Sequence, residues 1–346
     1  MLSSKIMATS AERASQFIMR YADPRLHLDS TSPGRRLKVL LLGTGIRNSI
    51  SPAIHNQLFK EFGLNAEYLL FDICEDEWES AMSALVNDND LLGFNVTAPF
   101  KERILPYITK LDEVASSVAA VNTVRVRGSG TNDSVLEGYN TDVEGVIASL
   151  ERLGIQRFQD EKISSEIGSV EARDEGGQQR TEKKAAILGA GGAARACVRA
   201  LIDCGFNSIE IMNRSKSRSE AIALHFTSRY PAVNFKVSYL EGGPIRKAIS
   251  SSRVVINAIS ERAALDGLAL NFEQLAEHDF AFLDLGYKGE SLLLRQARRA
   301  GVNSLDGLVM LAAQARKSFE IWSGILPQLS LVEAIATQAI QEARSV

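Results

Sequence analysis

The sequence predicts a two-domain protein of the α/β class. Three observations lead to this prediction: short apolar runs alternate with amphipathic segments, a glycine-rich turn follows one apolar run in the second half, and a polar stretch separates the halves. Alternating strands and helices form mostly parallel sheets covered by helices. The 346 residues also exceed what one hydrophobic core ordinarily supports, which favours two domains.

Composition limits the classes of partner. Hydrophobic residues make up 45% of the chain and charged residues 23%, as in globular proteins. The formal net charge of −3 offers no positive excess for nucleic acid or a membrane surface, and no apolar run is long enough to span a bilayer. The three scattered cysteines lack the spacing of a metal site. They indicate a reducing, cytoplasmic setting, and we expect no metal.

The chain divides into five predicted segments. The second domain is preceded by a stretch that is dense in charged and small polar residues and has little to bury, which indicates a flexible surface insertion. The first residues lack the apolar centre of a secretory signal and carry acidic residues that transit peptides avoid. We expect an N-terminal extension at 1–36, a first domain at 37–155, the insertion at 156–182, a second domain at 183–324, and helices at 325–346 that pack back on the first domain.

The central feature of the first domain is the segment Leu92–Lys101. Its apolar first half predicts a strand that ends before Pro99, and a helix is predicted to restart through Lys101. Asn95, Thr97 and Lys101 then lie at the carboxyl end of a strand, where open α/β sheets bind ligands. A lysine in a first helical turn opposes the helix dipole, so Lys101 is a candidate catalytic group.

Other candidate residues in this domain have structural explanations of comparable weight. Ser49 and Ser51 lie in a glycine- and serine-rich loop, and Ser51 is expected to cap the helix that begins at Pro52. Asn122 interrupts an apolar run, which suits a local side-chain bond as well as a function. Asp142 fits a helix start. Strands are predicted at 38–43, 66–73 and 135–139, and helices from 52, over 75–87 and from 142.

A dinucleotide fingerprint opens the second domain. A strand at 183–189 leads into a turn with the pattern glycine, any residue, glycine, any two residues, alanine, and a helix at 193–204 and a strand at 208–212 follow. The glycines permit a tight turn and a close approach of the backbone to a pyrophosphate at the helix N-terminus. The second domain is therefore predicted to be of the Rossmann type. The pyrophosphate-binding candidates are Gly189, Ala190, Gly191, Gly192 and Ala193.

The end of the second strand of this domain indicates the cofactor. NAD sites usually carry an acidic residue there, whereas this chain has Asn213, Arg214, Ser215 and Lys216. Arg214, with Lys216 or Arg218 behind it, could bind a 2′-phosphate, although a solvated basic helix start is the alternative. The pattern favours NADP. Further strands are predicted at 254–258 and 280–285 and helices at 306–322 and 330–343, with Gln314 on the helix surface by default.

The motifs and their order resemble the shikimate dehydrogenase family. The resemblance covers residues 37–345 apart from the insertion, and several separate motifs in one order are far more specific than any one of them. They are Gly43–Pro52 with His55 and Asn56, Gly93–Lys101, Ala120–Thr123, Gly138–Asp142, Gly189–Ala194, Asn213–Ser215, Asp284–Tyr287, Gly307–Leu311 with Gln314, and Phe319–Gly324.

This resemblance implies an activity and a role for each candidate. The implied reaction is the NADPH-dependent, reversible reduction of 3-dehydroshikimate to shikimate in aromatic amino acid biosynthesis, by a monomer or homodimer. Lys101 and Asp142 would form the acid–base pair. Ser49 and Ser51 would hold the substrate carboxylate, and Asn95, Thr97, Asn122, Asp142 and Gln314 the ring hydroxyls and carbonyl. Tyr287 would line the pocket, and Ala258 and Gly307 would contact the cofactor together with Asn213, Ser215 and the fingerprint.

The chain departs from the family pattern, and alternatives stay open. The family usually has proline at Gly45, histidine at Asn48, glycine at Ala119 and threonine at Ile259, and a proline and a threonine where this chain has Lys288–Ser291. A quinate dehydrogenase that uses NAD or NADP is one alternative. A methylenetetrahydrofolate dehydrogenase is another, although the paired serines fit it poorly. A metabolite-sensing regulator is a third, and the intact lysine and aspartate disfavour it.

Overall fold

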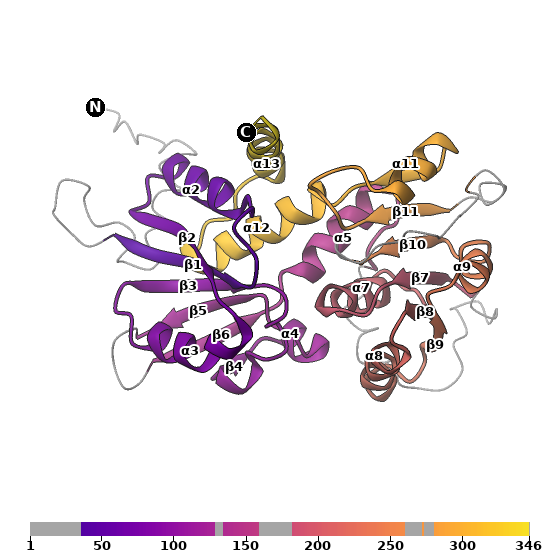
Figure 1. The fold of residues 1–346 in the computed structure, drawn as a ribbon, viewed down its shortest axis with the longest axis horizontal. Coiled ribbons are helices and arrows are strands. Elements are labelled where there is room, and N and C mark those ends of the chain that lie inside the picture. Colours follow the sequence, from indigo (N-terminus) through magenta and orange to yellow (C-terminus); the bar gives the residue numbers. More distant parts are fainter. Residues whose placement is uncertain (1–35, 129–133, 159–181, 260–271, 273–279, 346) are drawn as a thin grey trace, which may run out of the picture.

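Two six-stranded sheets form the frame of the molecule. The structure is a computed structural model that describes residues 36–128, 134–158, 182–259, 272 and 280–345. Most of the predicted N-terminal extension and of the insertion therefore lies outside the described residues. The sheets lie at opposite ends of the molecule, with the long helices α5 (Asp142–Arg152) and α12 (Leu308–Ser323) between them (Figure 1). The α/β class and the two-domain architecture are confirmed.

The first sheet is mostly parallel, as predicted. Its order is β2-β1-β3-β5-β6-β4, and β5 alone among its strands runs antiparallel to both neighbours. Helices α2, α12 and α13 share one hydrophobic cluster with this sheet, and α3 shares another. The strands are β1 (Leu37–Gly43), β2 (Ala66–Asp72), β3 (Leu91–Val96), β4 (Lys110–Leu111), β5 (Thr123–Arg127) and β6 (Val135–Tyr139). The helices are α2 (Ser51–Glu61), α3 (Trp78–Val86) after a 3-10 turn (Glu75–Glu77), α4 (Glu113–Val118) and α13 (Leu329–Arg344).

The second sheet is parallel throughout and has the order β12-β11-β10-β7-β8-β9. The strand order reverses beside β7, and such a switch point is where doubly wound sheets bind nucleotides. The strands are β7 (Lys184–Leu188), β8 (Ser208–Asn213), β9 (Asn234–Tyr239), β10 (Val254–Asn257), β11 (Ala281–Asp284) and β12 (Asn303–Leu305). The helices are α7 (Gly192–Asp203), α8 (Lys216–Arg229), α9 (Gly242–Ile249) and α11 (Leu292–Arg299).

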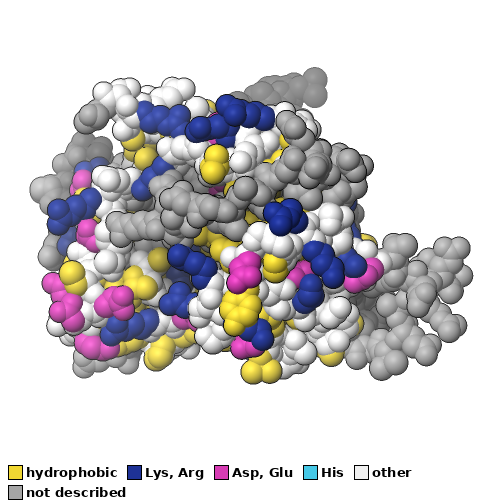
Figure 2. All heavy atoms as spheres, turned by 45° about the vertical axis from the view of Figure 1, so that its right-hand side comes forward, with side chains coloured by type: hydrophobic (Ala, Val, Ile, Leu, Met, Phe, Trp, Pro, Cys, Tyr) yellow, Lys and Arg dark blue, Asp and Glu magenta, His cyan; other side chains and the backbone are white. Residues whose placement is uncertain are grey.

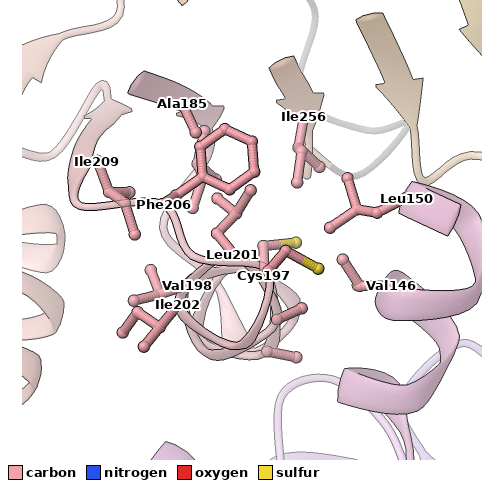
Figure 3. Packing of buried hydrophobic residues seen from close by; sticks show 14 of the residues in the cluster. Val146, Leu150, Ala185, Cys197, Val198, Leu201, Ile202, Phe206, Ile209 and Ile256 are labelled. Carbon is pink, nitrogen blue, oxygen red and sulfur yellow. The ribbon is translucent and has the colours of Figure 1, made fainter. Parts of the chain in front are cut away.

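A continuous hydrophobic cluster joins the two domains. Val146 and Leu150 of α5 point toward Cys197 and Leu201 of α7, and Ile256 of β10 lies close by (Figure 3). All five side chains are buried. Because apolar area removed from water stabilises by roughly 25 cal/mol per Å², this seam holds α7 close to the start of α5. The site residues carried by these two helices are therefore positioned relative to each other by ordinary core packing.

The prediction that a helix restarts through Lys101 is wrong. After β3 the chain makes consecutive turns, followed by a short 3-10 helix (Leu105–Tyr107). Pro106 lacks a backbone N–H and disfavours the helical conformation at the residue before it, which prevents a regular helix. Lys101 thus lies in a turn, where its carbonyl accepts a hydrogen bond from the Val121 N–H at 2.8 Å. Lys101 therefore does not lie in the first turn of a helix and does not oppose a dipole of that kind.

The described residues contain no helix that is both long and apolar enough to cross a membrane. On the face drawn in Figure 2, the described Lys and Arg side chains lie in separate small groups, with uncharged, hydrophobic and acidic side chains between them. The described residues on that face therefore form no continuous basic stripe of the kind that follows a nucleic-acid backbone.

One buried histidine makes the fold sensitive to acid. His55 of α2 is 1% exposed, stacks on Tyr68 with the ring centroids 4.5 Å apart, and has no described partner for Nδ1. Burial lowers the pKa of His55 from 6.5 to about 3. In the unfolded chain this histidine binds a proton below pH 6.5, whereas in the folded protein it stays neutral until about pH 3. The free energy of unfolding therefore decreases as the pH falls from 6.5 to about 3.

We expect His55→Phe to remove this acid sensitivity. The lower measuring pH, 4.5, lies two units below the pKa of 6.5 in the unfolded chain, and two units correspond to about 3 kcal/mol. Between pH 7.5 and 4.5 the unfolding free energy of the wild-type protein should therefore fall by about 3 kcal/mol more than that of the variant. Urea unfolding of both proteins at the two pH values measures the difference. The contributions of the carboxylates to the pH dependence are the same in both proteins and cancel. Parallel acid losses in the two proteins would contradict the assignment.

Candidate active site

Strand register brings the polar candidates to one edge of the first sheet. Asn95 near the end of β3 pairs with Thr123 at the start of the antiparallel β5, and Thr123 pairs with Tyr139 at the end of β6. Asn122 precedes β5 and Asp142 follows β6, so both lie at the same edge as Lys101, which follows β3. Residues far apart in sequence meet because β5 runs against its neighbours.

A cavity of about 320 Å³ opens at this edge and extends to the second domain. All the predicted catalytic and substrate-binding residues line it. They are Lys101, Asp142, Ser49, Ser51, Asn95, Thr97, Asn122, Tyr287 and Gln314. Ala193 and Gly307 of the cofactor set also line it, together with apolar residues such as Leu41, Ile46, Met310 and Leu311. Met310 and Leu311 were not predicted as site residues, although they sit one helical turn before Gln314.

Lys101 and Asp142 form an ion pair in the cavity wall. Lys101 Nζ lies 2.5 Å from Asp142 Oδ2, and the two side chains are 16% and 6% exposed. The other carboxylate oxygen, Oδ1, accepts a hydrogen bond from Asn122 Nδ2 at 2.9 Å. Both oxygens of Asp142 are thus engaged, and the ammonium group of Lys101 is held at the cavity beside a negative charge.

The two serines of the first loop both line the cavity. Ser51 was predicted to cap the following helix, and this is wrong: α2 begins at Ser51 itself and has no side-chain cap. Ser49 Oγ lies 3.2 Å from Ser51 Oγ and accepts from the Ser51 backbone N–H at 3.3 Å. A pair of hydroxyl groups at the first turn of a helix can donate to a carboxylate, which the helix N-terminus also favours.

Lys101 also contacts the glycine-rich turn of the second domain. A Cβ atom added to Gly192 would lie 3.2 Å from Cδ of Lys101, so a larger residue there would require the lysine side chain to shift. Next to it, Arg195 of α7 forms an ion pair with Glu102 at 3.2 Å. The candidate proton donor of the first domain therefore lies against the N-terminus of α7, where the fingerprint would hold a pyrophosphate.

The glycine-rich turn has the form that a dinucleotide requires. Gly189 has φ +112°, a left-handed conformation that favours glycine, and a Cβ there would approach the carbonyl of Ala258 to 3.0 Å. At Gly191 a Cβ would meet no described atom within 4 Å, so the turn leaves open space beside its backbone. Ala190 lies between them at the end of β7, which places this predicted set together at the switch point of the sheet.

The basic segment lies at the carboxyl end of the neighbouring strand β8. Arg214 is exposed and forms no ion pair with the described residues, whereas Lys216 pairs with Glu220 at 3.2 Å. The Asn213 side chain donates to the carbonyl of Ser215 at 3.1 Å and shapes the turn. Of Arg214 and Lys216, Arg214 is therefore the one whose positive charge is not already paired with a described carboxylate.

Comparison with known proteins matches this geometry to one family. The family model for the shikimate dehydrogenase substrate binding domain matches residues 41–124, and that for shikimate / quinate 5-dehydrogenase matches residues 171–285. A shikimate dehydrogenase (NADP(+)) from Caldanaerobacter subterraneus subsp. tengcongensis is 33% identical over 287 residues, which are 82% of this chain and 90% of that protein. The chain belongs to the shikimate dehydrogenase family.

Solved members of the shikimate dehydrogenase family have the same fold. The Listeria monocytogenes shikimate 5-dehydrogenase, in complex with shikimate and NAD, superposes with a TM-score of 0.71 and 28% identity over 89% of this chain and 99% of its own. The Thermus thermophilus enzyme in complex with NADP(H) and shikimate gives a TM-score of 0.65 and 26% identity, over 88% and 99% of the two chains.

Two departures from the usual shikimate dehydrogenase pattern have a structural meaning. Ala119 has φ +53°, so the glycine usual at this position fits the left-handed backbone better than alanine does. In the altered loop, Ser291 accepts from the Leu294 N–H at 3.1 Å and caps α11, and it also bonds to Asp284. Lys288 of the same loop lines the cavity, and the sequence analysis did not assign it a role.

Proposed function

We propose that this member of the shikimate dehydrogenase family reversibly reduces 3-dehydroshikimate to shikimate with NADPH. The observation that carries the proposal is the Lys101–Asp142 pair at the cavity wall, 2.5 Å apart and against Gly192 of the dinucleotide turn. A proton donor in contact with the cofactor-binding turn is what the reduction of a carbonyl group requires.

In the proposed reaction, Lys101 supplies the proton. A bound nicotinamide cofactor would supply the hydride to the carbonyl carbon. The Lys101 ammonium donates its proton to the carbonyl oxygen and stabilises the negative charge that develops there. Asp142 holds the ammonium group through Oδ2. In the reverse direction the neutral amine accepts the hydroxyl proton.

The remaining lining residues suit a polyhydroxylated acid. Ser49 and Ser51 supply hydroxyl donors for a carboxylate, and Thr97, Tyr287 and Gln314 bring further hydroxyl and amide groups to the same cavity. A site built on such bonds rejects analogues that lack a hydroxyl, because its own polar groups would then be left unpaired.

We propose NADP as the cofactor. The open space at Gly191 and the positive φ of Gly189 suit a pyrophosphate at the N-terminus of α7, and the exposed Arg214 offers charge for a 2′-phosphate. The relatives named shikimate dehydrogenase (NADP(+)) support the same choice. We also propose the predicted domain boundaries, a cytoplasmic location and a monomer or homodimer.

The activity is tested with purified protein by following nicotinamide absorbance with shikimate or quinate and with NADP⁺ or NAD⁺. We expect kcat/KM for shikimate with NADP⁺ to exceed each of the other three combinations by on the order of tenfold or more. A Lys101→Ala protein purified in the same way excludes a contaminating host enzyme. Faster turnover of quinate would replace the proposed substrate, and tight metabolite binding without turnover would indicate a sensor.

A further inference from the structure

We propose that Ser117, near the C-terminal end of α4, is a positioning residue that fixes the second domain against Lys101. Arg199 of α7 and His225 of α8 bind Ser117 from across the domain boundary, and we call these three residues the α4 clamp. The inference rests on the proposed function, because the clamp sets the distance between the proton donor and the cofactor-binding turn.

The end of α4 offers carbonyl groups that its own helix does not use. The last carbonyl oxygens of any helix have no N–H partner within it, and α4 ends at Val118, before the left-handed Ala119. The Ser117 carbonyl oxygen accepts a hydrogen bond from His225 Nε2 at 2.8 Å. The Val118 carbonyl oxygen accepts one from Arg195 of α7 at 3.4 Å. Side chains of the second domain therefore complete the end of a first-domain helix.

Arg199 binds the side chain of the same serine. This arginine is buried, and its Nη1 donates to Ser117 Oγ at 2.6 Å. The Ser117 hydroxyl in turn donates to the carbonyl of Val114 at 2.8 Å, so it is used both as acceptor and as donor. On its own helix, Arg199 Nε donates to Asp203 at 2.8 Å. A guanidinium presents several N–H groups in one rigid plane, which suits it to join two domains in a fixed geometry.

The clamp holds α7 on a different face from the hydrophobic seam with α5. Cys197 faces α5, and Arg199 lies two residues further along α7, so the two side chains point about 160° apart around the helix. Helix α7 is therefore held by α5 on one face and by α4 on another (Figure 1). A helix packed along one face only can still roll about that contact, and a second contact across it prevents the movement.

The clamp is connected to Lys101 through both domains. In the first domain, Val121 follows the end of α4, and its N–H donates to the Lys101 carbonyl at 2.8 Å. In the second domain, Gly192 begins α7, about 10 Å before Arg199 along the same helix. Gly192 is also the residue that lies against the Lys101 side chain. Loosening the clamp should therefore shift the dinucleotide turn relative to the lysine.

The test removes the contacts of the clamp by Ser117→Ala and His225→Phe. Alanine suits a helix, and both changes leave Arg199 with its carboxylate partner on α7, so the variants should fold. His225→Gln is the conservative variant, because its amide N–H can still donate to the Ser117 carbonyl. Ser149→Ala is the matched control, since that hydroxyl is also buried but donates within α5, to the carbonyl of Gly145 at 2.9 Å.

We expect Ser117→Ala and His225→Phe each to lower kcat for shikimate with NADP⁺ about fivefold, and the double variant about 20-fold, since each change removes one hydrogen bond from the clamp. The Kd of shikimate alone and of NADP⁺ alone should stay within about twofold, because the groups proposed to bind them lie outside the clamp. His225→Gln and Ser149→Ala should match wild type. An unchanged kcat in the double variant, or weaker binding of both ligands, would overturn the positioning role.

A second measurement does not depend on turnover. Cys74 of the first domain is exposed and the other two cysteines are buried, so Leu292→Cys at an exposed position on α11 adds a second spin-label site in the second domain. Pulsed electron–electron double resonance should give one narrow distance distribution that broadens in the double clamp variant. Equally narrow distributions would overturn the inference. Broadening, together with a wild-type protein that does not turn over shikimate, would instead sink the proposed function and leave the clamp standing.

Discussion

Replacing Lys101 by alanine is expected to lower kcat for shikimate by about 10³-fold, because the reaction loses both its proton donor and the charge that stabilises the developing alkoxide. KM should stay within about twofold, since the serines and hydroxyl groups that bind the substrate are unchanged. Steady-state kinetics with NADP⁺ measure both constants. Lys110→Ala, an exposed lysine on β4 of the same domain, is the control and should retain full activity.

Stability must be separated from chemistry in this experiment. Asp142 is 6% exposed, so removing Lys101 leaves a buried carboxylate without its partner, and the melting temperature should fall. The double variant Lys101→Ala/Asp142→Asn removes the stranded charge. We expect it to recover most of the melting temperature and none of the turnover. Recovery of activity together with stability would show that Lys101 has only a structural role.

The second large effect is expected at Arg214. Arg214→Ala should raise KM for NADP⁺ by about 100-fold, because a charge-assisted bond to the 2′-phosphate is lost, and should change KM for NAD⁺ by less than about twofold. Arg229→Ala, at the far end of α8, controls for a general loss of positive charge on this helix. Kinetics with each cofactor measure the effect.

The comparison of the two cofactors is decisive for Arg214. NAD lacks the 2′-phosphate and otherwise occupies the same turn, so any disturbance of the turn itself would weaken both cofactors equally. An equal loss would therefore assign Arg214 to the shape of the turn after β8. Lys216, which is paired with Glu220, is expected to contribute less than Arg214, and Lys216→Ala ranks the two side chains.

The dinucleotide turn could be predicted from sequence because its requirements are local. A strand, two closely spaced glycines and a helix determine the backbone from Gly189 to Gly192, and the structure has that form, including the positive φ of Gly189. The strand β3 was predictable for the same reason, since a buried and mostly apolar run depends on little beyond itself. The local prediction failed at Lys101, because Pro106, five residues further along the chain, prevents a regular helix.

The sequence by itself determined the α/β class, the fingerprint, the basic segment at Arg214 and, through family resemblance, which residues belong to the cavity. Tertiary structure decided how they act together. The antiparallel direction of β5 brings Asn122 beside Asp142, and the packing of α5 on α7 brings Lys101 against Gly192. The side-chain amide of Asn95 bonds to the hydroxyl group of Ser318, which lies 223 residues away along the chain. No local pattern encodes such contacts, because they exist only when separate strands and helices share one core.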